Sequence, residues 1–548
     1  MADDGSFAFT GAPTPEELAR FDLTDLGNAK RLIRLVGGQF DDAGGVDARR
    51  ATLLFLIGFG WVGFNGRFWD RELGDQLAQR TAHMVATKMR GLFHELSEAH
   101  QGVTPKEVMK FIDSCGNRGS LSAMLSVGQP YLTVRIDDFD QHKLAINCKN
   151  GTLWLEFDRS APAGKRFRAT LRDHDPADRL TRCAAIDYDA KAEAPHFQRV
   201  LADALRQPDE RAAFGRMMGY GVTGFIHEQA FFFVQGKGRD GKSTLLDACR
   251  ETMGTYAGVG KPETFLDGGP QTGSGPQPDI VALAGDTRFA VVSEPKRGSR
   301  LNEGMMKAWT SGSPITARDL NAKPITFRPT TKQFWEMNSL VVTRGDDDGI
   351  WRRMHLALFR HQVPPDQVDK LLPDKLRAEA AGILNWLVAG VADWLDVGLA
   401  WPEGWRDALE NYRRASSPFG DWLQERCVWG EAAKGARTLA GDLYGDFKTW
   451  AEDQGHDKIM SQRSFGDGLT DRQVMVVGKN GVGKKYRGPI RLKTPDELAA
   501  DVEAAEAAAA QAGALSGPSG AGGTSLAGQP GDVPEPGSFD GSEEWSGQ

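Results

Sequence analysis

One stretch near the middle of the 548-residue chain limits its fold more than any other. Four apolar residues, Phe231 to Val234, predict a short buried strand, and a glycine-rich loop follows directly. From Lys242 onward the apolar side chains recur at helical spacing. Because strand, glycine loop and helix occur in this order, the pattern G-x-x-x-x-G-K-S predicts a phosphate-binding loop in an α/β sheet.

The residues of this loop suit the chemistry of a nucleoside triphosphate. Glycines let backbone N–H groups converge on phosphate oxygens, and the N-terminus of the following helix adds its positive end. Lys242 would neutralise the β- and γ-phosphates, and Ser243 would bind Mg²⁺. The predicted cofactor-binding residues are Gly236, Lys237, Gly238, Arg239, Asp240, Gly241, Lys242, Ser243 and Thr244.

Length and cysteine usage bound the class of protein. A chain of 548 residues is too long for one core, so two to four domains are expected. No apolar run approaches the ~20 residues of a membrane span, which predicts no membrane partner. The five cysteines are scattered and never form C-x-x-C, which favours a reducing cytoplasm and argues against a zinc site.

The net charge of −8 comes from the C-terminal tail. From Thr494 to the end the chain has ten acidic residues and no Lys or Arg, which leaves 64 acidic against 66 basic residues in the body. The acidity therefore does not argue against a nucleic-acid partner.

Two further apolar stretches predict strands that end in polar residues. Phe289 to Val292 runs into Ser293 and Glu294, and Gln333 to Met337 runs into Asn338. A carboxylate at such a strand end holds Mg²⁺ or polarises the attacking water, so Glu294 is favoured as functional over a plain core strand. Asn338 either orients a water or is an ordinary turn residue.

The segment between and after these strands adds basic candidates. Residues 315–318 and 325–328 alternate like two strands, so residues 321–323 are predicted to form a hairpin tip. Acidic turns at 173–178 and 346–348 are interpreted as solvated turns in preference to metal sites. Arg352 and Arg353 either form a surface salt bridge or reach the γ-phosphate of a neighbouring subunit.

Residues 419–492 are predicted to form a small separate unit. Two helices, at 439–450 and 461–469, precede a basic glycine-containing hairpin, an order typical of a winged helix with its wing on the phosphate backbone. The wing contains a second match to G-x-x-x-x-G-K, from Gly478 to Lys484, but Lys485 stands where a Ser or Thr is needed. It is rejected as a nucleotide site. The predicted DNA contacts of this unit are Lys479, Lys484, Lys485 and Arg487.

The order of these parts resembles the superfamily 3 helicases, in the form found in the phage and plasmid primase-helicase family related to the poxvirus NTPase. The resemblance extends from about Asp25 to Leu492. The segments that carry it, besides the phosphate loop, Glu294 and Asn338, are Asp25–Ala29, Tyr131–Val134, Leu301–Glu303 with Lys307, Ile315–Arg318 and Gly349–Arg353.

The resemblance implies roles for individual residues. The cofactors would be ATP and Mg²⁺, with Lys242 and Ser243 at the phosphates and metal, Glu294 as catalytic acid and metal ligand, and Asn338 as sensor. Arg352 or Arg353 would be the arginine finger. The implied DNA contacts in this region are Lys307, Arg318 and Lys323.

The function implied is an ATP-dependent replicative DNA helicase, a homo-hexameric ring on single-stranded and forked DNA, with a separate primase or polymerase as a further partner. Two alternatives stay open. One is a bifunctional primase-helicase, although no paired catalytic carboxylates are evident upstream. The other is a non-motor initiator that uses ATP as an assembly switch, against which Lys242, Glu294 and Arg353 argue.

The predicted fold is α/β, an AAA+-like P-loop core preceded by an α+β domain. The expected parts are a flexible leader (1–20), the N-terminal α+β domain (21–195), the ATPase core (196–365), a helical lid (366–415), a winged-helix-like domain (416–493) and a disordered acidic tail (494–548).

Overall fold

The computed structural model describes residues 12–501, apart from residues 163, 269–274, 321–322, 344–347, 417 and 456–458. The chain divides into two compact units, Met1–Gly420 and Asp421–Gln548. Within the predicted acidic tail, residues 495–501 are helical and residues 502–548 lie outside the described residues. The disorder predicted for the rest of the tail, residues 502–548, therefore stays a prediction.

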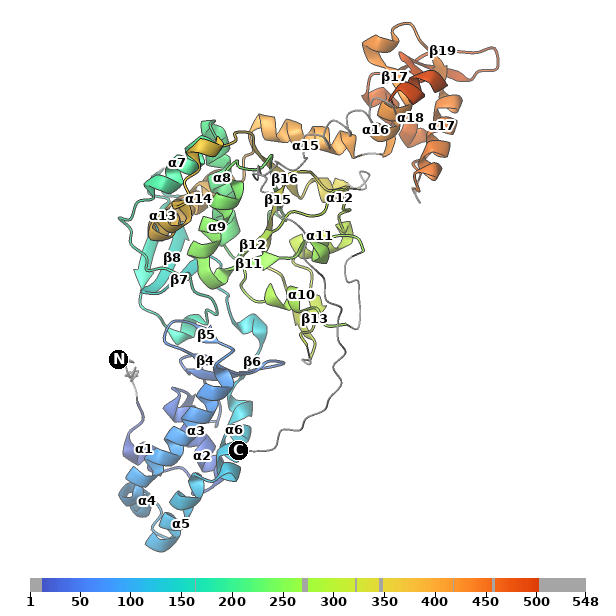
Figure 1. Ribbon diagram of the computed structural model, residues 1–548. Coiled ribbons are helices and arrows are strands. Elements are labelled where there is room, and N and C mark those ends of the chain that lie inside the picture. The colour runs from blue at the N-terminus through green and yellow to red at the C-terminus, as the bar shows by residue number, and fades with distance from the viewer. Residues whose placement is uncertain are drawn as a thin grey trace, which may run out of the picture. The chain divides into compact units, whose positions relative to one another are not determined.

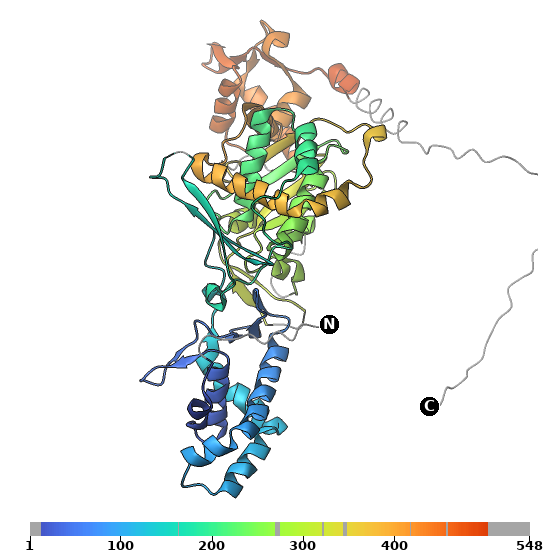
Figure 2. The same cartoon turned by 90° about the vertical axis from the view of Figure 1, so that its left-hand side faces the viewer.

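The N-terminal part of the first unit packs helices against a small sheet (Figure 2, blue). Leu32 and Ile33 of the second helix, Leu54 and Met89 are fully buried in this core. The elements are α1 (Pro15–Ala19), α2 (Asp25–Leu35), β1 (Gln39–Phe40), β2 (Val46–Asp47), β3 (Leu53–Leu56), β4 (Gly60–Phe64), β5 (Trp69–Asp70), α3 (Gly74–Gly91), α4 (Phe93–Ala99), α5 (Pro105–Cys115), α6 (Arg118–Gly128) and β6 (Thr133–Val134).

The flexible leader predicted for residues 1–20 is wrong in its second half. Thr14 caps α1 by accepting a hydrogen bond from the Glu17 N–H, and Leu18 and Ala19 are buried in the N-terminal core. Burial of these two side chains explains why the segment is ordered, since apolar area removed from water offsets the entropy of fixing the backbone. Residues 1–11 lie outside the described part of the chain.

A three-stranded antiparallel sheet follows, formed by β7 (Ala145–Cys148), β8 (Gly151–Phe157) and β9 (Phe167–Arg172). The sequence Asn147–Leu155, with Asn150-Gly151 between two short runs, predicts a small hairpin. The pairing of Cys148 with Gly151 confirms it. The fully buried Arg288 donates to the Ala145 carbonyl at 2.8 Å and forms an ion pair with Asp286 at 2.6 Å. It thereby ties this sheet to the segment that enters the central sheet.

The central sheet has five parallel strands in the order β11-β12-β15-β10-β16. The predicted strands after Phe231, Phe289 and Gln333 are confirmed as β10, β12 and β15. The elements are α7 (Pro195–Ala204), α8 (Pro208–Val222), β10 (Phe231–Gly236), α9 (Lys242–Met253), β11 (Ala257–Gly260), α10 (Pro278–Ala282), β12 (Phe289–Val292), α11 (Glu303–Thr310), β13 (Ile315–Ala317), β14 (Ile325–Phe327), β15 (Lys332–Met337), α12 (Asp348–Trp351) and β16 (Met354–Phe359).

Helices cover both faces of this sheet, with α8, α9 and α14 (Ala380–Val397) on one side and α11 and α12 on the other (Figure 1). Successive side chains of β10 point to opposite faces, so Phe232 joins the core with α8 and α9, whereas Phe233 joins the core with α11. Burial on both faces explains why the strands read as continuous apolar runs. The prediction of an α/β fold is confirmed, and the structure adds that the sheet is parallel.

The region predicted as a helical lid contains α13 (Leu372–Ala378), α14 (Ala380–Val397) and α15 (Glu403–Ala415). Within the described residues α14 is the one helix long and apolar enough to cross a bilayer, judged by length and composition. Its Ile383, Leu387 and Val391 are fully buried in the core shared with α8, so we interpret it as a core helix. The sequence had indicated no apolar segment of this length.

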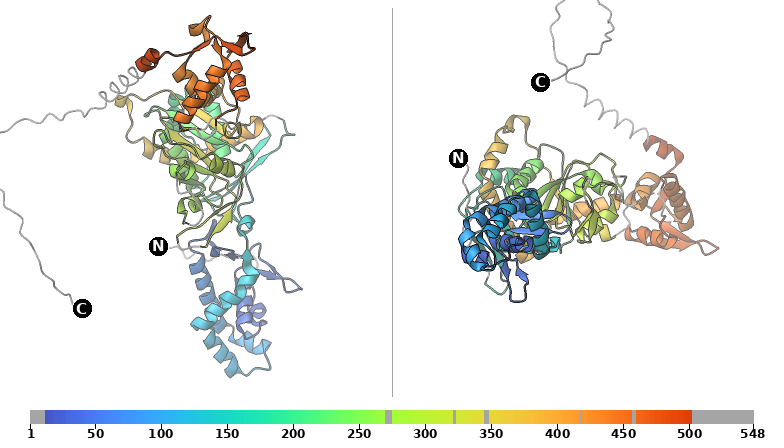
Figure 3. Two further views of the ribbon diagram at one scale, coloured as in Figure 1. Left: turned by 90° about the vertical axis from the view of Figure 1, so that its right-hand side faces the viewer. Right: turned by 90° about the horizontal axis from the view of Figure 1, so that it is seen from below.

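The second unit, orange in Figure 3, is built around an aromatic cluster. The rings of Trp422, Phe447 and Phe465 lie 5.1–5.7 Å apart and are buried. Helix α16 (Pro418–Arg426) leads into this unit. Its further elements are β17 (Cys427–Trp429), β18 (Thr438–Leu439), α17 (Ala440–Asp453), α18 (Gln462–Asp471), β19 (Met475–Lys479), β20 (Lys485–Gly488) and β21 (Ile490–Leu492).

Candidate functional site

The candidate site lies at the carboxyl edge of the central sheet. Strand β10 leads into the glycine loop, Glu294 stands two residues after β12, and Asn338 follows β15 directly. Because these strands are parallel neighbours, their carboxyl ends meet at one edge, where α/β sheets bind ligands. A pocket of about 260 Å³ there is lined by residues 238–244 together with Glu294, Glu336 and Asn338.

The loop holds its backbone amides around a carboxylate. The N–H groups of Gly238 and Lys242 donate to the Asp240 side chain at 3.1 and 3.3 Å. Gly236 must be glycine, because a Cβ there would lie 1.8 Å from Asp240 Oδ2. Gly241 caps α9 with φ of +82°, a conformation that glycine adopts without strain. The amides therefore converge on an anionic group, as they would on a phosphate.

Three predicted catalytic residues form a hydrogen-bonded chain beside this loop. Lys242 Nζ, on a buried side chain, donates to Asn338 Oδ1 at 3.1 Å and forms an ion pair with Asp240 at 3.1 Å. The Asn338 backbone N–H and Nδ2 donate to the two carboxylate oxygens of Glu294, at 2.9 and 2.6 Å. Asn338 thus links the ammonium group to the carboxylate, a geometry that the sequence could not specify.

Glu336 is a pocket residue that the sequence analysis missed. It lies on β15 in register with Val234 of β10 and shares the pocket with Ser243. Burial raises the pKa of Glu336. Among the described residues its buried Oε1 has no hydrogen-bond partner, an arrangement that costs roughly 1–3 kcal/mol. A signal was present, since Glu336 stands two residues before Asn338 and therefore points to the same side of the strand.

The segment after β16 forms hydrogen bonds to the glycine loop that the sequence did not predict. Gln362 Nε2 donates to the carbonyls of Lys237 and Gly238 at 3.1 and 2.9 Å, and the Val363 N–H donates to the Arg239 carbonyl at 2.7 Å. These bonds fasten the loop to the segment after β16. No local pattern around Gln362 indicated this role, because the contact joins residues more than 120 positions apart.

The side chains of the pocket fit a hard cation such as Mg²⁺. Ser243, Glu336 and Glu294 offer oxygen donors in one pocket, and Mg²⁺ in nucleotide sites is held by one or two carboxylates together with substrate phosphates. Larger clusters of three or more His, Cys, Asp or Glu with metal-binding geometry do not occur in the described residues. The interpretation of the acidic turn at 173–178 as solvated stays a prediction, and residues 346–347 of the other turn lie outside the described residues.

The two candidate finger arginines differ in exposure. Arg353 is 7% exposed, donates to the Gly349 carbonyl at 2.5 Å and to Gln229 Oε1 at 2.9 Å. These bonds and this burial favour a structural role for Arg353 inside its own unit, and its role as a finger stays a prediction. Arg352 is exposed and is the more accessible candidate.

The three predicted DNA contacts of the first unit, Lys307, Arg318 and Lys323, differ in how exposed their side chains are. Strands β13 and β14 pair as predicted, with Thr316 opposite Thr326; Asn321 and Ala322 of the predicted tip lie outside the described residues, and Lys323 next to them is exposed. Arg318 is half-buried. Lys307 is also half-buried, with Nζ 3.8 Å from Glu303, so of these three side chains Lys323 is the most accessible to DNA.

The hairpin of the second unit carries the other predicted DNA contacts. Lys479, Lys484 and Lys485 are exposed around the turn between β19 and β20. Arg487 instead donates to Thr470 Oγ1 and to the Gly466 carbonyl, at 2.8 and 2.9 Å. It thereby fastens β20 to α18, and its assignment as a DNA contact stays a prediction.

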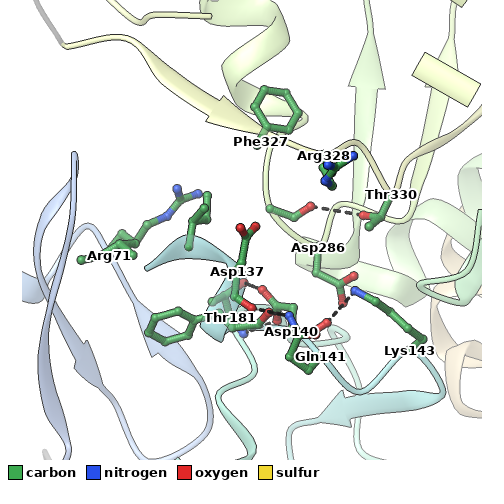
Figure 4. Close-up of a pocket in the computed structure, with 14 residues that line it drawn as sticks. Arg71, Asp137, Asp140, Gln141, Lys143, Thr181, Asp286, Phe327, Arg328 and Thr330 are labelled. Atoms are coloured by element: carbon green, nitrogen blue, oxygen red, sulfur yellow. Dashed lines mark hydrogen bonds between the residues drawn. The ribbon is translucent and has the colours of Figure 1, made fainter. Parts of the chain in front are cut away.

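A second pocket of the first unit, of about 240 Å³, lies at the amino ends of β12 and β15 (Figure 4). The carboxylate of Asp140 accepts hydrogen bonds from the N–H and Oγ1 of Thr181, at 2.8 and 2.6 Å. Burial, with a smaller contribution from Asp286, raises the pKa of Asp140 to about 6. None of the predicted site residues lines this pocket, which stands at the edge of the sheet opposite the glycine loop.

Part of the N-terminal half of the chain is similar to a known protein family. Residues 42–206 match the family described as "D5 N terminal like". This range runs from β2 to the end of α7 and stops just before α8. The glycine loop itself lies outside the matched range.

Viral relatives extend the similarity. The chain is 26% identical over 336 residues to "Putative helicase L207/L206" of Acanthamoeba polyphaga mimivirus, covering 57% of this chain and 33% of the relative. It is 29% identical over 157 residues to "Putative helicase 022R" of Frog virus 3, covering 28% of this chain and 16% of the relative. The chain thus spans a third or less of the length of these relatives.

Among solved structures, one described as "The A form apo structure of NrS-1 C terminal region-CTR" is similar at 10% identity with a TM-score of 0.39, over 79% of this chain and 95% of that one. The family match and the viral relatives support the resemblance drawn from the motifs: the chain is similar to the D5 N-terminal-like family over residues 42–206 and to viral proteins named putative helicases.

Proposed function

We propose that this protein is an ATP-dependent DNA helicase of the D5 type, a ring-forming motor that moves along single-stranded DNA. The observation that carries the proposal is the chain of hydrogen bonds from Lys242 through Asn338 to Glu294 beside the glycine loop. It joins a phosphate-binding cation to a carboxylate at the edge of a parallel sheet, where ATPases hold and cleave a triphosphate. The strand order β11-β12-β15-β10-β16 supports an AAA+-like core.

The proposed chemistry assigns one task to each residue. The loop amides and Lys242 hold the phosphates, and Glu294 with Asn338 orients the attacking water. As the water oxygen bonds to the γ-phosphorus, the bond to the ADP oxygen breaks and Glu294 accepts the proton of the water. Mg²⁺ beside Ser243 would supply charge neutralisation at the β- and γ-phosphate oxygens.

Assembly and DNA binding are parts of the same proposal. In a homo-hexameric ring, the exposed Arg352 of one subunit would reach the γ-phosphate held by its neighbour and stabilise the charge that develops there. Lys323 beside the β13–β14 tip and the lysines of the β19–β20 hairpin would contact DNA phosphates. A winged-helix role for the second unit and a cytoplasmic location complete the proposal, and the five buried, unpaired cysteines are consistent with a reducing compartment.

The test compares the wild-type protein with Glu294→Gln in three assays: ATP binding, DNA-stimulated ATP hydrolysis and unwinding of forked DNA. A motor should hydrolyse ATP faster with single-stranded DNA and should unwind forks. Glu294→Gln should retain ATP binding and lose hydrolysis by roughly 10²–10⁴-fold, the usual contribution of a positioned base.

Two other outcomes would contradict the proposal. A wild-type protein that binds ATP but shows neither DNA-stimulated hydrolysis nor unwinding would be an assembly switch in place of a motor. A wild-type protein that binds no nucleotide would remove the enzyme class altogether. Light scattering of the Arg352→Ala variant with ATP and DNA separates the finger from assembly, because loss of the finger should lower hydrolysis while a ring still forms.

A further inference from the structure

The proposed ATPase site needs two kinds of acidic group, and β12 supplies one. P-loop enzymes use one carboxylate to hold the metal beside the loop Ser or Thr and another group to orient water. Strand β12 ends in Val292, Ser293 and Glu294, so it presents a single carboxylate at this edge. Both oxygens of that carboxylate already accept hydrogen bonds from Asn338, which directs Glu294 to the water side of the site.

The neighbouring strand supplies the missing carboxylate. Glu336 of β15 lines the same pocket as Ser243 and Asn338. Ser243 and Lys242 line this pocket beside Glu336, close enough for both side chains to influence its carboxylate electrostatically. Its Oε1 has no hydrogen-bond partner within the described residues, which leaves one acceptor oxygen of the pair available to a cation.

Position along the strand fixes this placement. Phe334 of β15 belongs to the core that includes Leu245 and Leu246 of α9. Because side chains alternate, Glu336 points to the same side as Phe334, toward the N-terminus of α9 where Ser243 lies. The rigid sheet, and not a mobile loop, therefore aims this carboxylate at the residue that would bind the metal.

We propose that Glu336 is the metal-holding carboxylate of this site, working with Ser243, and that Glu294 is left to act on water. The proposal rests on the proposed ATPase function. It assigns the metal to the carboxylate of β15 and the attacking water to the carboxylate that follows the adjacent strand β12. A cation held by Ser243 and Glu336 would use oxygen ligands alone, the set that Mg²⁺ prefers. A purely structural Glu336, serving only as acceptor for Ser243, would make no difference to the metal dependence of nucleotide binding.

The test measures the affinity of the full-length protein for a fluorescent ATP analogue as free Mg²⁺ is varied, with an EDTA sample as the metal-free reference. Wild type, Glu336→Gln and Glu294→Gln are compared. For Glu336→Gln, the Mg²⁺ concentration that gives half of the metal-dependent gain in affinity should rise roughly 10–100-fold, while affinity in EDTA is retained. Glu294→Gln should keep the wild-type Mg²⁺ response and lose hydrolysis.

A second variant guards against a folding defect. In Glu336→Cys, the thiolate favours softer metals, so nucleotide binding supported by Cd²⁺ relative to Mg²⁺ should rise at least about tenfold over the wild-type ratio. Circular dichroism and thermal melting establish that each variant is folded. Mn²⁺ paramagnetic resonance in the presence of ATP reports metal binding without reference to turnover.

The outcomes separate this proposal from the one on which it rests. An unchanged Mg²⁺ response in folded Glu336→Gln, or a metal defect that appears in Glu294→Gln instead, would overturn the assignment of Glu336 while the ATPase proposal stands. A wild-type protein that binds no nucleotide with or without Mg²⁺ would overturn both.

Discussion

The pattern G-x-x-x-x-G-K occurs twice in this chain, and the two copies fold differently. Residues 236–242 connect the parallel strand β10 to helix α9, whereas residues 478–484 form the turn between the antiparallel strands β19 and β20. In the first copy Lys242 is 6% exposed and faces the other site residues. In the second copy Lys484 is exposed at a turn.

In both loops a side chain accepts hydrogen bonds from the backbone N–H groups of the loop, and the first loop lines the pocket of the candidate site. Asp240 accepts from two loop N–H groups inside the first copy, and Asn480 Oδ1 accepts from the Val482 and Lys484 N–H groups in the second. The first loop is backed by a helix N-terminus and by strand ends that carry Glu294 and Asn338. The second is followed by a strand, with no helix to add its positive end. The glycine pattern alone therefore does not make a phosphate site.

The largest expected difference between the copies is in ATP hydrolysis. Lys242→Ala should lower ATP turnover by roughly 10²–10³-fold, the effect of removing one preorganised charge from such a site. The matched control Lys484→Ala should hydrolyse ATP at the wild-type rate, measured without DNA. Comparable losses in the two variants would show that the hairpin also takes part in nucleotide chemistry and would end the distinction.

Stability gives the next largest contrast. Gly241 and Gly483 share φ of +82°, so replacing either with Ala should cost roughly 1–2 kcal/mol of folding free energy in its own unit. Scanning calorimetry should show the loss. Only Gly241→Ala should also weaken ATP binding, because its amide belongs to the loop that holds phosphate. Normal ATP affinity in Gly241→Ala would indicate that the backbone of the first loop is not the phosphate cradle.

For DNA affinity, substitutions in the second loop should have a larger effect than substitutions in the first. The double variant Lys484→Ala/Lys485→Ala removes two exposed charges of the hairpin. It should bind single-stranded DNA roughly tenfold more weakly, and the slope of log K against log salt should fall by about 1.4. Lys242→Ala serves as the control with unchanged DNA affinity when nucleotide is absent. Salt titrations by fluorescence anisotropy measure both quantities.

The smallest expected effect concerns the fifth position of each loop, which is the carboxylate Asp240 in the first copy and Val482 in the second. Asp240 is 2% exposed and pairs with Lys242, so ATP must compete with a carboxylate for the same cation. Asp240→Asn keeps a polar side chain, removes that charge and should tighten ATP binding roughly threefold to tenfold. At the matching position of the hairpin, Val482 is 84% exposed, and Val482→Asn should leave ATP affinity unchanged. Weaker binding by Asp240→Asn would mean that the carboxylate supports the loop conformation more than it opposes phosphate.

Local patterns predicted the elements that carry the site better than the side chains that complete it. The apolar runs before Gly236, Ser293 and Asn338 gave the three strands because each run is buried on both faces. The same reading concealed Glu336, since a carboxylate inside an apolar strand does not mark a strand end. The sequence also offered Arg352 and Arg353 as equally good candidates for the arginine finger, although Arg352 is exposed and Arg353 is buried.

The sequence by itself determined the α/β class, the strand–loop–helix around Lys242 and the two hairpins at 147–155 and 315–328, since these depend on residues near one another in the chain. Only the tertiary structure decided which strands are neighbours, and with them the meeting of Lys242, Glu294, Glu336 and Asn338 in one pocket. It also decided that Arg353 and Arg487 are held by hydrogen bonds inside their own units. The physical reason is that strand order and side-chain burial follow from packing between segments far apart in sequence, which no local spacing encodes.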